Sequence, residues 1–250
     1  MIELLTDPQA WIALATLTAL ELVLGIDNVI FIAILVDKLP AHQRERARRI
    51  GLFMAMFMRV GLLLTLSWLI GLTAPLFELF GRGISGRDLI LILGGLFLIW
   101  KSTGEIHQGM EGDEEHSGPG RAAAGFALVI GQIMVIDVIF SLDSIITAVG
   151  MVDDLPVMIA AVMVSVGLMM IFAGSIGRFV SAHPTIKMLA LSFLVVVGVV
   201  LIAEGFGHHV PKGYIYFAMA FSVAVEMLNI RMRSRMQIKV KAQTPQAPQS

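Results

Sequence analysis

The sequence predicts an all-α polytopic membrane protein with seven transmembrane helices. Hydrophobic residues make up 57% of its 250 positions and charged residues only 15%, and the mean hydropathy is +0.84. Soluble domains are instead about 45–50% apolar and about 25% charged. The chain has no Cys, which excludes disulfides, thiolate metal sites and cysteine nucleophiles. Any metal site must therefore use oxygen or histidine ligands.

Seven segments supply the expected helices, because a span needs about 20 predominantly apolar residues. The fifth is the clearest, since Leu155 to Gly177 contains no charged residue. The third is the weakest, because only Leu89 to Trp100 lies between Asp88 and Lys101. That length also suits a re-entrant segment, and the segment spans a bilayer comfortably only if the lysine snorkels. The expected spans are residues 10–36, 50–73, 87–105, 122–149, 155–177, 186–206 and 213–230.

Basic residues predict the orientation of these spans. Cytoplasmic loops of membrane proteins carry an excess of Lys and Arg, and the segments after spans one, five and seven are the basic ones. We therefore expect a periplasmic N-terminus and a cytoplasmic C-terminus. The basic residues on the cytoplasmic side are Lys38, Arg44, Arg46, Arg48, Arg49, Arg178, Lys187, Arg231, Arg233, Arg235, Lys239 and Lys241, against Arg82, Arg87 and Lys212 on the other side.

Acidic residues recur at the same spacing inside the first and fourth spans. ELVLGIDNVIFI and DVIFSLDSIITA each have an acid, five further residues, an aspartate and a small polar residue. A carboxylate in hydrocarbon costs at least about 2.5 kcal/mol, so intramembrane acids usually line a pathway or pair with a cation. Two matched sets predict one metal site built twice, with Glu21, Asp27, Asn28, Asp137, Asp143 and Ser144 as ligands.

Helix geometry limits how these side chains can meet. A step of seven residues returns to the same helix face, whereas a step of six leaves a side chain about 120° away. Glu21 therefore shares a face with Asn28, and Asp137 shares one with Ser141 and Ser144. The two aspartates reach those faces only if each helix is distorted, for which the glycine in the first motif and the serine in the second offer places.

The two acidic motifs also predict inverted repeats. Spans one to three and four to six each begin with a motif, and an odd number of spans reverses the second copy in the membrane. LFLIWK, ending at Lys101, matches VVLIAE, ending at Glu204. Inverted repeats are a transporter architecture with the site near the midplane. The expected divisions are 1–106 for the first repeat, 107–121 for an acidic cytoplasmic linker, 122–206 for the second repeat, 207–232 for the seventh helix and 233–250 for a disordered cytoplasmic tail.

The chemistry of the acidic residues predicts which kind of cation they bind. Carboxylates with amide and hydroxyl oxygens suit Mg²⁺, Ca²⁺ or Mn²⁺ rather than Zn²⁺ or Cu⁺. Protons can occupy the same carboxylates, so cation/proton exchange is a chemically reasonable mechanism. We expect the metal ion as substrate and the lipid bilayer as partner, with no cofactor, no nucleic acid and no enzymatic activity. Self-association into a homo-oligomer is left open.

Three alternatives stay open beside a transporter site. The acids can pair with buried cations, for which Arg59 and Lys101 are candidates; these two and Glu204 are also candidate gating or charge partners. The two aspartates can form a protease dyad that shares a proton, but the sequences LGIDN and FSLDS lack the GxGD context of such enzymes. The acids can also hold helices together in a membrane scaffold of a metal-resistance, tellurite-resistance or envelope-stress complex.

The strings ELVLGIDNVIF, ARRIGLFMAMFMRVGLL, DVIFSLDSIITAVG and PKGYIYFAMAFSVAVEMLN resemble the TerC family of bacterial inner-membrane proteins. The resemblance covers Trp11 to Asn229 and is greatest to short, membrane-only members of a wider lysine-exporter-like group. It implies export of a divalent cation, with Mn²⁺ favoured, and links the family to tellurium resistance. The direction of transport rests on this resemblance alone. By motif match, the acidic residues of the family correspond to Glu21, Asp27 with Asn28, Asp137, and Asp143 with Ser144, and its intramembrane arginine to Arg59.

Overall fold

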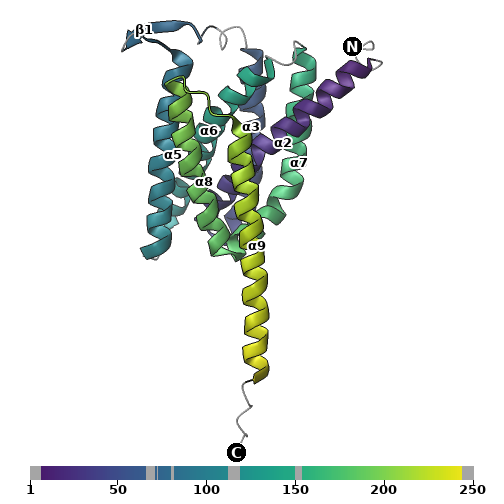
Figure 1. Cartoon of the computed structure of the whole chain (residues 1–250), viewed down its shortest axis with the longest axis vertical. Coiled ribbons are helices and arrows are strands. Elements are labelled where there is room, and N and C mark those ends of the chain that lie inside the picture. The colour runs from purple at the N-terminus through teal and green to yellow at the C-terminus, as the bar shows by residue number, and fades with distance from the viewer. Residues whose placement is uncertain are drawn as a thin grey trace, which may run out of the picture. The chain divides into compact units, whose positions relative to one another are not determined.

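The computed structural model describes residues 7–65, 71, 73–79, 82–111, 119–149 and 154–243, and within these ranges the side chains of Asp27 and Asp143 lie outside the description. The described part is predominantly helical, in agreement with the predicted class (Figure 1). Its helices are α2 (Pro8–Asp37), α3 (Ala41–Leu64), α5 (Gly86–Glu111), α6 (Pro119–Val149), α7 (Leu155–Ala182), α8 (Pro184–Gly205) and α9 (Lys212–Gln243).

Six of these helices are long and apolar enough to cross a membrane: α2, α5, α6, α7, α8 and α9. The third predicted span is therefore a full helix in α5, which extends past Lys101 to Glu111. The second predicted span corresponds to α3. The described residues of α3 are not long and apolar enough to be a candidate membrane-crossing helix. The reason is its composition: α3 begins with the polar run AHQRERARR, and its apolar part from Ile50 to Leu64 contains Arg59. Residues 66–70 lie outside the described part, so this span stays a prediction.

A β-hairpin precedes α5, and the all-helical prediction missed it. Strand β1 (Pro75–Leu79) pairs antiparallel with β2 (Arg82–Ser85), so that Leu79 lies opposite Arg82. The hairpin leads directly into α5 through a capping box. The backbone N–H and hydroxyl of Ser85 donate to Asp88 Oδ2 at 2.9 and 2.7 Å, and the Asp88 N–H donates back to Ser85 Oγ at 3.2 Å. Such reciprocal bonds satisfy backbone donors that have no partner in the first helical turn.

Proline and capping residues define the other helix starts. Asp7 Oδ1 accepts a hydrogen bond of 2.9 Å from the Gln9 N–H at the start of α2, where Pro8 is the first helical residue. Pro156 and Pro184 lie in the first turns of α7 and α8. Proline suits these positions because the first N–H groups of a helix have no intrahelical partner to lose. The sequence thus fixes where several spans begin.

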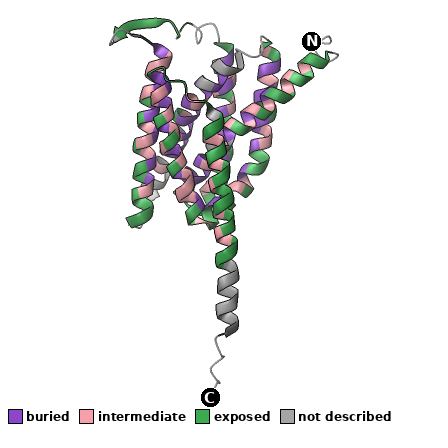
Figure 2. Cartoon of the chain, in the orientation of Figure 1, coloured by how far each residue is buried: buried purple, intermediate pink, exposed green. Residues whose placement is uncertain are grey.

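Residues 1–210 form one compact unit, in which the helices run alternately in opposite directions (Figure 1). Helix α5 packs along α8, α2 along α7, and α3 along both α6 and α7. The α2–α3 and α7–α8 junctions lie at one end of the unit and the hairpin at the other (Figure 1). Buried residues face the interior of this unit (Figure 2), and one core cluster joins α2, α6 and α7 through Leu17, Leu142 and Met158.

Two glycines set the close approach of α5 and α8. A Cβ atom on Gly198 would lie 2.8 Å from the carbonyl oxygen of Gly95, and a Cβ atom on Gly95 would meet the carbonyl oxygen of Gly198. In membranes, small residues allow helix backbones to approach closely and gain van der Waals contact, because lipid provides no hydrophobic driving force between helices. The α5–α8 pair therefore depends on the absence of side chains at these two positions.

The first residues of the predicted acidic linker are helical. Helix α5 continues to Glu111, into the segment expected as linker from residue 107. Its last turns carry two ion pairs between residues four apart: Lys101 Nζ lies 2.8 Å from Glu105 Oε1, and His107 Nε2 lies 3.1 Å from Glu111 Oε2. Such pairs stabilise a helix when both groups are charged. Residues 112–118 lie outside the described part.

Residues 211–250 form a second unit, which contains α9. The helix continues to Gln243, so residues 233–243, which were predicted to belong to the disordered tail, are helical. The reason is local: RMRSRMQIKVKA, which spans residues 231–242, contains neither Pro nor Gly and is rich in good helix formers such as Arg, Met and Lys. Residues 244–250 lie outside the described part.

We predict that Gly95→Ala destabilises the protein by about 1–3 kcal/mol, because the added methyl group meets a backbone carbonyl that cannot rotate away. The matched control is Gly104→Ala on the same helix, where a Cβ meets nothing within 4 Å. Denaturant unfolding of both variants in mixed micelles measures the difference. Equal stabilities of the two variants would contradict the close α5–α8 contact.

Candidate functional site

The candidate site is a buried ion-pair cluster contributed by α2, α3 and α6. Glu21, Arg59 and Asp137 are each 4% exposed. Arg59 Nη1 donates to Glu21 Oε2 at 2.6 Å, and Arg59 Nη2 donates to Asp137 Oδ1 at 2.7 Å. Arg59 Nε adds contacts of 3.0 and 3.4 Å to Asp137 Oδ1 and Oδ2. One guanidinium thus holds two carboxylates from separate helices through charge-assisted hydrogen bonds.

Two small polar side chains complete the cluster around Asp137. Asn28 Nδ2 donates to Asp137 Oδ1 at 3.4 Å, and Ser141 Oγ donates to Asp137 Oδ2 at 3.2 Å. The helical spacing predicted Ser141 on the face of Asp137 and Asn28 on the face of Glu21. All four residues belong to this cluster. Ser144 is buried, but its hydroxyl donates to the Ser141 carbonyl at 3.1 Å. The predicted ligand Ser144 therefore bonds within α6, while Ser141 bonds to the acid.

The cluster contains two carboxylates and one guanidinium. With both carboxylates ionised, one guanidinium leaves a net negative charge among buried side chains. Asn28 Oδ1 and Thr18 Oγ1 are also buried atoms without a hydrogen-bond partner among the described residues. Buried oxygens normally have such a partner, so each exception requires an explanation. Oxygens beside carboxylates are the ligands that hard cations prefer.

The site as described does not amount to a metal cage. Among the described residues, no group of three His, Cys, Asp or Glu side chains is placed to hold a metal ion. Asp27 and Asp143 are two of the predicted ligands, and their side chains are not among those that the structure describes. The alternative in which the acids pair with a buried cation is what the structure shows for Glu21 and Asp137, with Arg59 as that cation.

Neither acidic helix is interrupted at its motif. Helix α2 is continuous from Pro8 to Asp37, and α6 is continuous from Pro119 to Val149. The distortion considered at Gly25 and Ser141 does not interrupt either helix. A Cβ on Gly25 would meet the flexible end of the Met169 side chain of α7. The backbone carbonyls of these helices are therefore not freed as extra cation ligands.

The two remaining charge candidates lie in other contacts. Lys101 pairs with Glu105, whose Oε1 also lies 2.6 Å from Lys38 Nζ. Glu105 is buried, and this contact ties the end of α2 to α5. Sequence reasoning missed Glu105, although its spacing of four residues from Lys101 is a usable signal. Glu204 is buried on α8, next to Gly205, which packs against Ile92 of α5.

A second ion-pair network lies at the end of α2. Asp37 Oδ1 lies 2.7 Å from Arg44 Nη1 of α3 and accepts a 3.2 Å hydrogen bond from Ser181 Oγ of α7. Asp37 Oδ2 lies 3.5 Å from Lys187 Nζ of α8. This carboxylate therefore links α2 to three other helices. Arg44 and Lys187 are among the basic residues predicted on the cytoplasmic side, whereas Asp37 was not predicted as their partner.

Comparison with known proteins agrees with the motif resemblance. The family model "Integral membrane protein TerC family" matches residues 6–241. A UPF0053 protein of Haemophilus influenzae is 58% identical over 236 residues, which cover 94% of this chain and 100% of that protein. The UPF0053 inner membrane protein YgdQ of Escherichia coli K12 is 60% identical over 226 residues, which cover 90% of this chain and 94% of that protein.

A longer relative shares the same region. The UPF0053 inner membrane protein YoaE of Escherichia coli K12 is 51% identical over 227 residues, and the match covers 91% of this chain but 44% of that protein. No solved structure matches the chain.

We predict that Arg59→Gln destabilises the protein by about 3–5 kcal/mol, the usual cost of removing one partner from a buried ion pair. A second substitution, Glu21→Gln, should recover part of this loss because it removes one of the two carboxylates left without a counter-charge. Arg46→Gln, an exposed arginine on the same helix, is the matched control. Unfolding of the single and double variants in mixed micelles tests the coupling, and additive effects of the two substitutions would contradict it.

Proposed function

We propose, because the chain belongs to the TerC family of integral membrane proteins, that it is a membrane transporter that exports a divalent metal cation and has no enzymatic activity. Mn²⁺ is the favoured substrate, ahead of Ca²⁺ and Mg²⁺. The observation that carries this proposal is the buried pair of carboxylates, Glu21 and Asp137, which face one cationic group from two separate apolar helices. The favoured metal and the direction of transport come from the family resemblance.

A cationic group already lies where the substrate would bind. Acids within membrane helices commonly mark ion pathways, and here they surround a guanidinium rather than an apolar side chain. The unpartnered Asn28 Oδ1 adds a hard oxygen at the same place. Asp27, Asp143 and Ser144 are proposed as further ligands on the basis of their motif positions.

Arg59 has a specific role in this proposal. Its guanidinium balances the carboxylates when no metal is bound, and it must leave them when a divalent cation arrives, because like charges repel strongly in a region of low dielectric constant. The return of Arg59 then competes with the metal and favours its release. Exchange of one cation for another avoids a state in which buried carboxylates have no counter-charge.

We further propose that α2, α3 and α5 form an inverted repeat with α6, α7 and α8. Under this correspondence the α2–α7 contact matches α6–α3, and the α2–α8 contact matches α6–α5. Because α5 is matched with α8, the α5–α8 contact is its own counterpart. Its two close glycines, Gly95 and Gly198, stand equally far before Lys101 and Glu204, the residues at which LFLIWK and VVLIAE align. Helices α2 and α6 also run in opposite directions (Figure 1).

The proposed location is the bacterial inner membrane, with a periplasmic N-terminus and a cytoplasmic C-terminus. Two relatives are named as inner membrane proteins. The basic residues Lys38, Arg44, Arg178 and Lys187 flank the α2–α3 and α7–α8 junctions, which lie at the same end of the unit (Figure 1). An excess of Lys and Arg at this end supports its assignment to the cytoplasm.

A membrane scaffold is the second candidate, and one observation favours it. Arg59 bonds to both acids, so the cluster can serve to hold α2, α3 and α6 together without any transported ion. In that role the acid-to-amide variants would lose stability or partner binding, and the purified protein would carry no cation flux. The two functions therefore differ in a flux measurement.

We predict that the purified protein carries Mn²⁺ into liposomes containing a dye that Mn²⁺ quenches, and that Asp27→Asn and Asp143→Asn each abolish this flux. Both variants remove a negative charge from the proposed site while keeping the size of the side chain. Glu78→Gln, an exposed acid in the hairpin, is the matched control and should transport normally. Repeating the assay with and without a pH gradient tests proton coupling.

Two outcomes decide between the candidates. Normal flux in both aspartate variants would exclude the proposed acidic site. Absence of flux above protein-free liposomes, from folded protein tested with Mn²⁺, Ca²⁺ and Mg²⁺, would favour the scaffold.

A further inference from the structure

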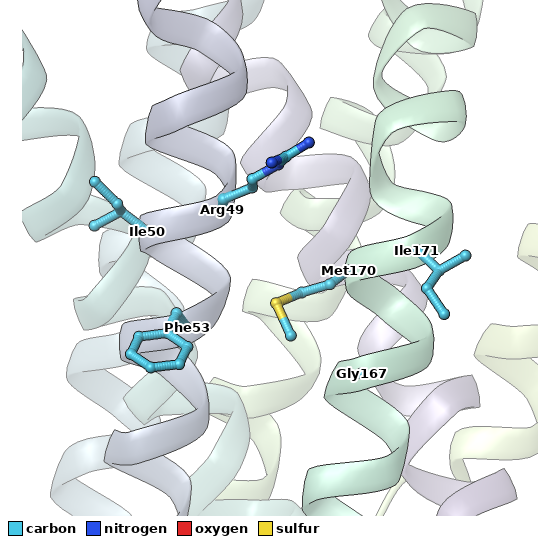
Figure 3. A pocket seen from close by; sticks show the side chains of 6 residues that line it. All are labelled: Arg49, Ile50, Phe53, Gly167, Met170 and Ile171. Atoms are coloured by element: carbon cyan, nitrogen blue, oxygen red, sulfur yellow. The ribbon is translucent and has the colours of Figure 1, made fainter.

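A groove of about 530 Å³ runs between α3 and α7 (Figure 3). Apart from one arginine, its lining is apolar. The side chain of Phe53 is half exposed and that of Ile171 is 71% exposed, so the groove opens on the surface of the helical unit. The lining residues are Arg49, Ile50 and Phe53 from α3, and Gly167, Met170 and Ile171 from α7.

The shape of the groove follows from a glycine and two long side chains. A Cβ atom on Gly167 would meet nothing within 4 Å, so the α7 backbone is open at this point. Arg49 extends from α3 towards α7, and Met170 extends from α7 towards α3 (Figure 3). The groove therefore combines an apolar channel with a guanidinium.

More arginines lie beside this guanidinium. Arg48 is buried between the two helices, where its Nη1 atom would lie 2.8 Å from a Cβ on Gly177. A Cβ on Gly174 would lie 3.2 Å from Arg48 Nη2 and 3.5 Å from Arg178 Nη1, which places both guanidiniums against the same turn of α7.

One carboxylate, Glu45, pairs with two of these arginines. It accepts a 2.9 Å hydrogen bond from Arg49 Nε and forms an ion pair with Arg48. Arg178 Nη2 donates to the uncharged Ser175 hydroxyl at 3.2 Å. The positive charges of the three arginines therefore exceed the negative charge of Glu45 at this end of the groove.

We infer that the groove binds an anionic phospholipid of the surrounding bilayer. An acyl chain lies along Ile50, Phe53 and Met170, and the phosphate group contacts Arg49. Charge complementarity selects this occupant, because guanidinium groups bind phosphate oxygens well and the excess positive charge needs a ligand with net negative charge. A zwitterionic lipid supplies the chain but not the charge. Basic sites between membrane helices at the cytoplasmic surface commonly bind anionic head groups.

The inference does not rest on metal transport, because neither Arg49 nor the apolar lining belongs to the Arg59 cluster. It does give the two helices a shared ligand. A lipid bound along both α3 and α7 would stabilise their contact at the end where α3 is most polar.

Native mass spectrometry of the full chain in detergent, with added phosphatidylglycerol or phosphatidylcholine, tests this inference. The wild-type protein should retain more phosphatidylglycerol. Arg49→Gln should lower the affinity for it about five-fold, the effect of one basic residue near a charged membrane surface. Glu45→Gln should raise retention, because it frees the arginines, and a loss of folding cannot produce that result.

Gly167→Leu tests the apolar half of the site. A Cβ at this position meets nothing within 4 Å, so a leucine side chain should extend into the groove, and retention of both lipids should fall. Two matched controls should bind as wild type does. Gly131→Leu is at an open position on a different helix, α6, and Arg231→Gln replaces an exposed arginine of α9. Equal retention of the two lipids by the wild-type protein would overturn the inference. Wild-type retention by Arg49→Gln and Gly167→Leu, or equal losses in the controls, would also overturn it.

Discussion

The rest of the structure depends on the pairing of Arg59 with Glu21 and Asp137. None of these side chains can remain charged alone in an apolar interior, because the desolvation of each costs several kcal/mol. Paired, they fix the positions of α2, α3 and α6 relative to one another, since the guanidinium reaches both acids at hydrogen-bond distance. The cluster therefore acts at once as a structural tie and as a cation-binding arrangement that already contains its own cation.

The surrounding contacts divide into close backbone packing and polar ties. Gly95 and Gly198 bring α5 and α8 together without side chains between them. At one end of the unit, Asp37 links α2 to α3, α7 and α8 through ion pairs and a hydroxyl. Polar ties of this kind exchange partners more readily than interlocked backbones, because each can be replaced by water at the membrane surface. In a transporter, the ends of α2 and α3 are thus better suited to rearrange than the α5–α8 pair.

The sequence predicted much of the fold and part of the site. Helix periodicity correctly placed Asn28 on the face of Glu21 and Ser141 on that of Asp137, because those positions depend only on a regular helix. It could not identify which cation would pair with the acids, because the reach of Arg59 depends on how α3 packs against two other helices. Short-range spacing also missed the hairpin before α5, which contains no strongly alternating segment. It placed residues 233–243 in a disordered tail, whereas helix-forming residues continue α9 there.

The central claim is that Arg59 holds the place of a transported cation. Its most direct test is the effect of Mn²⁺ on the thermal unfolding of Arg59→Gln beside the wild-type protein, in detergent and at equal metal concentrations. A ligand that binds only the folded state raises the unfolding temperature, and without the guanidinium the carboxylates should bind Mn²⁺ more tightly. We expect a larger increase for the variant than for the wild type. A variant that Mn²⁺ does not stabilise would show that Arg59 is a structural tie and not a competitor of the metal.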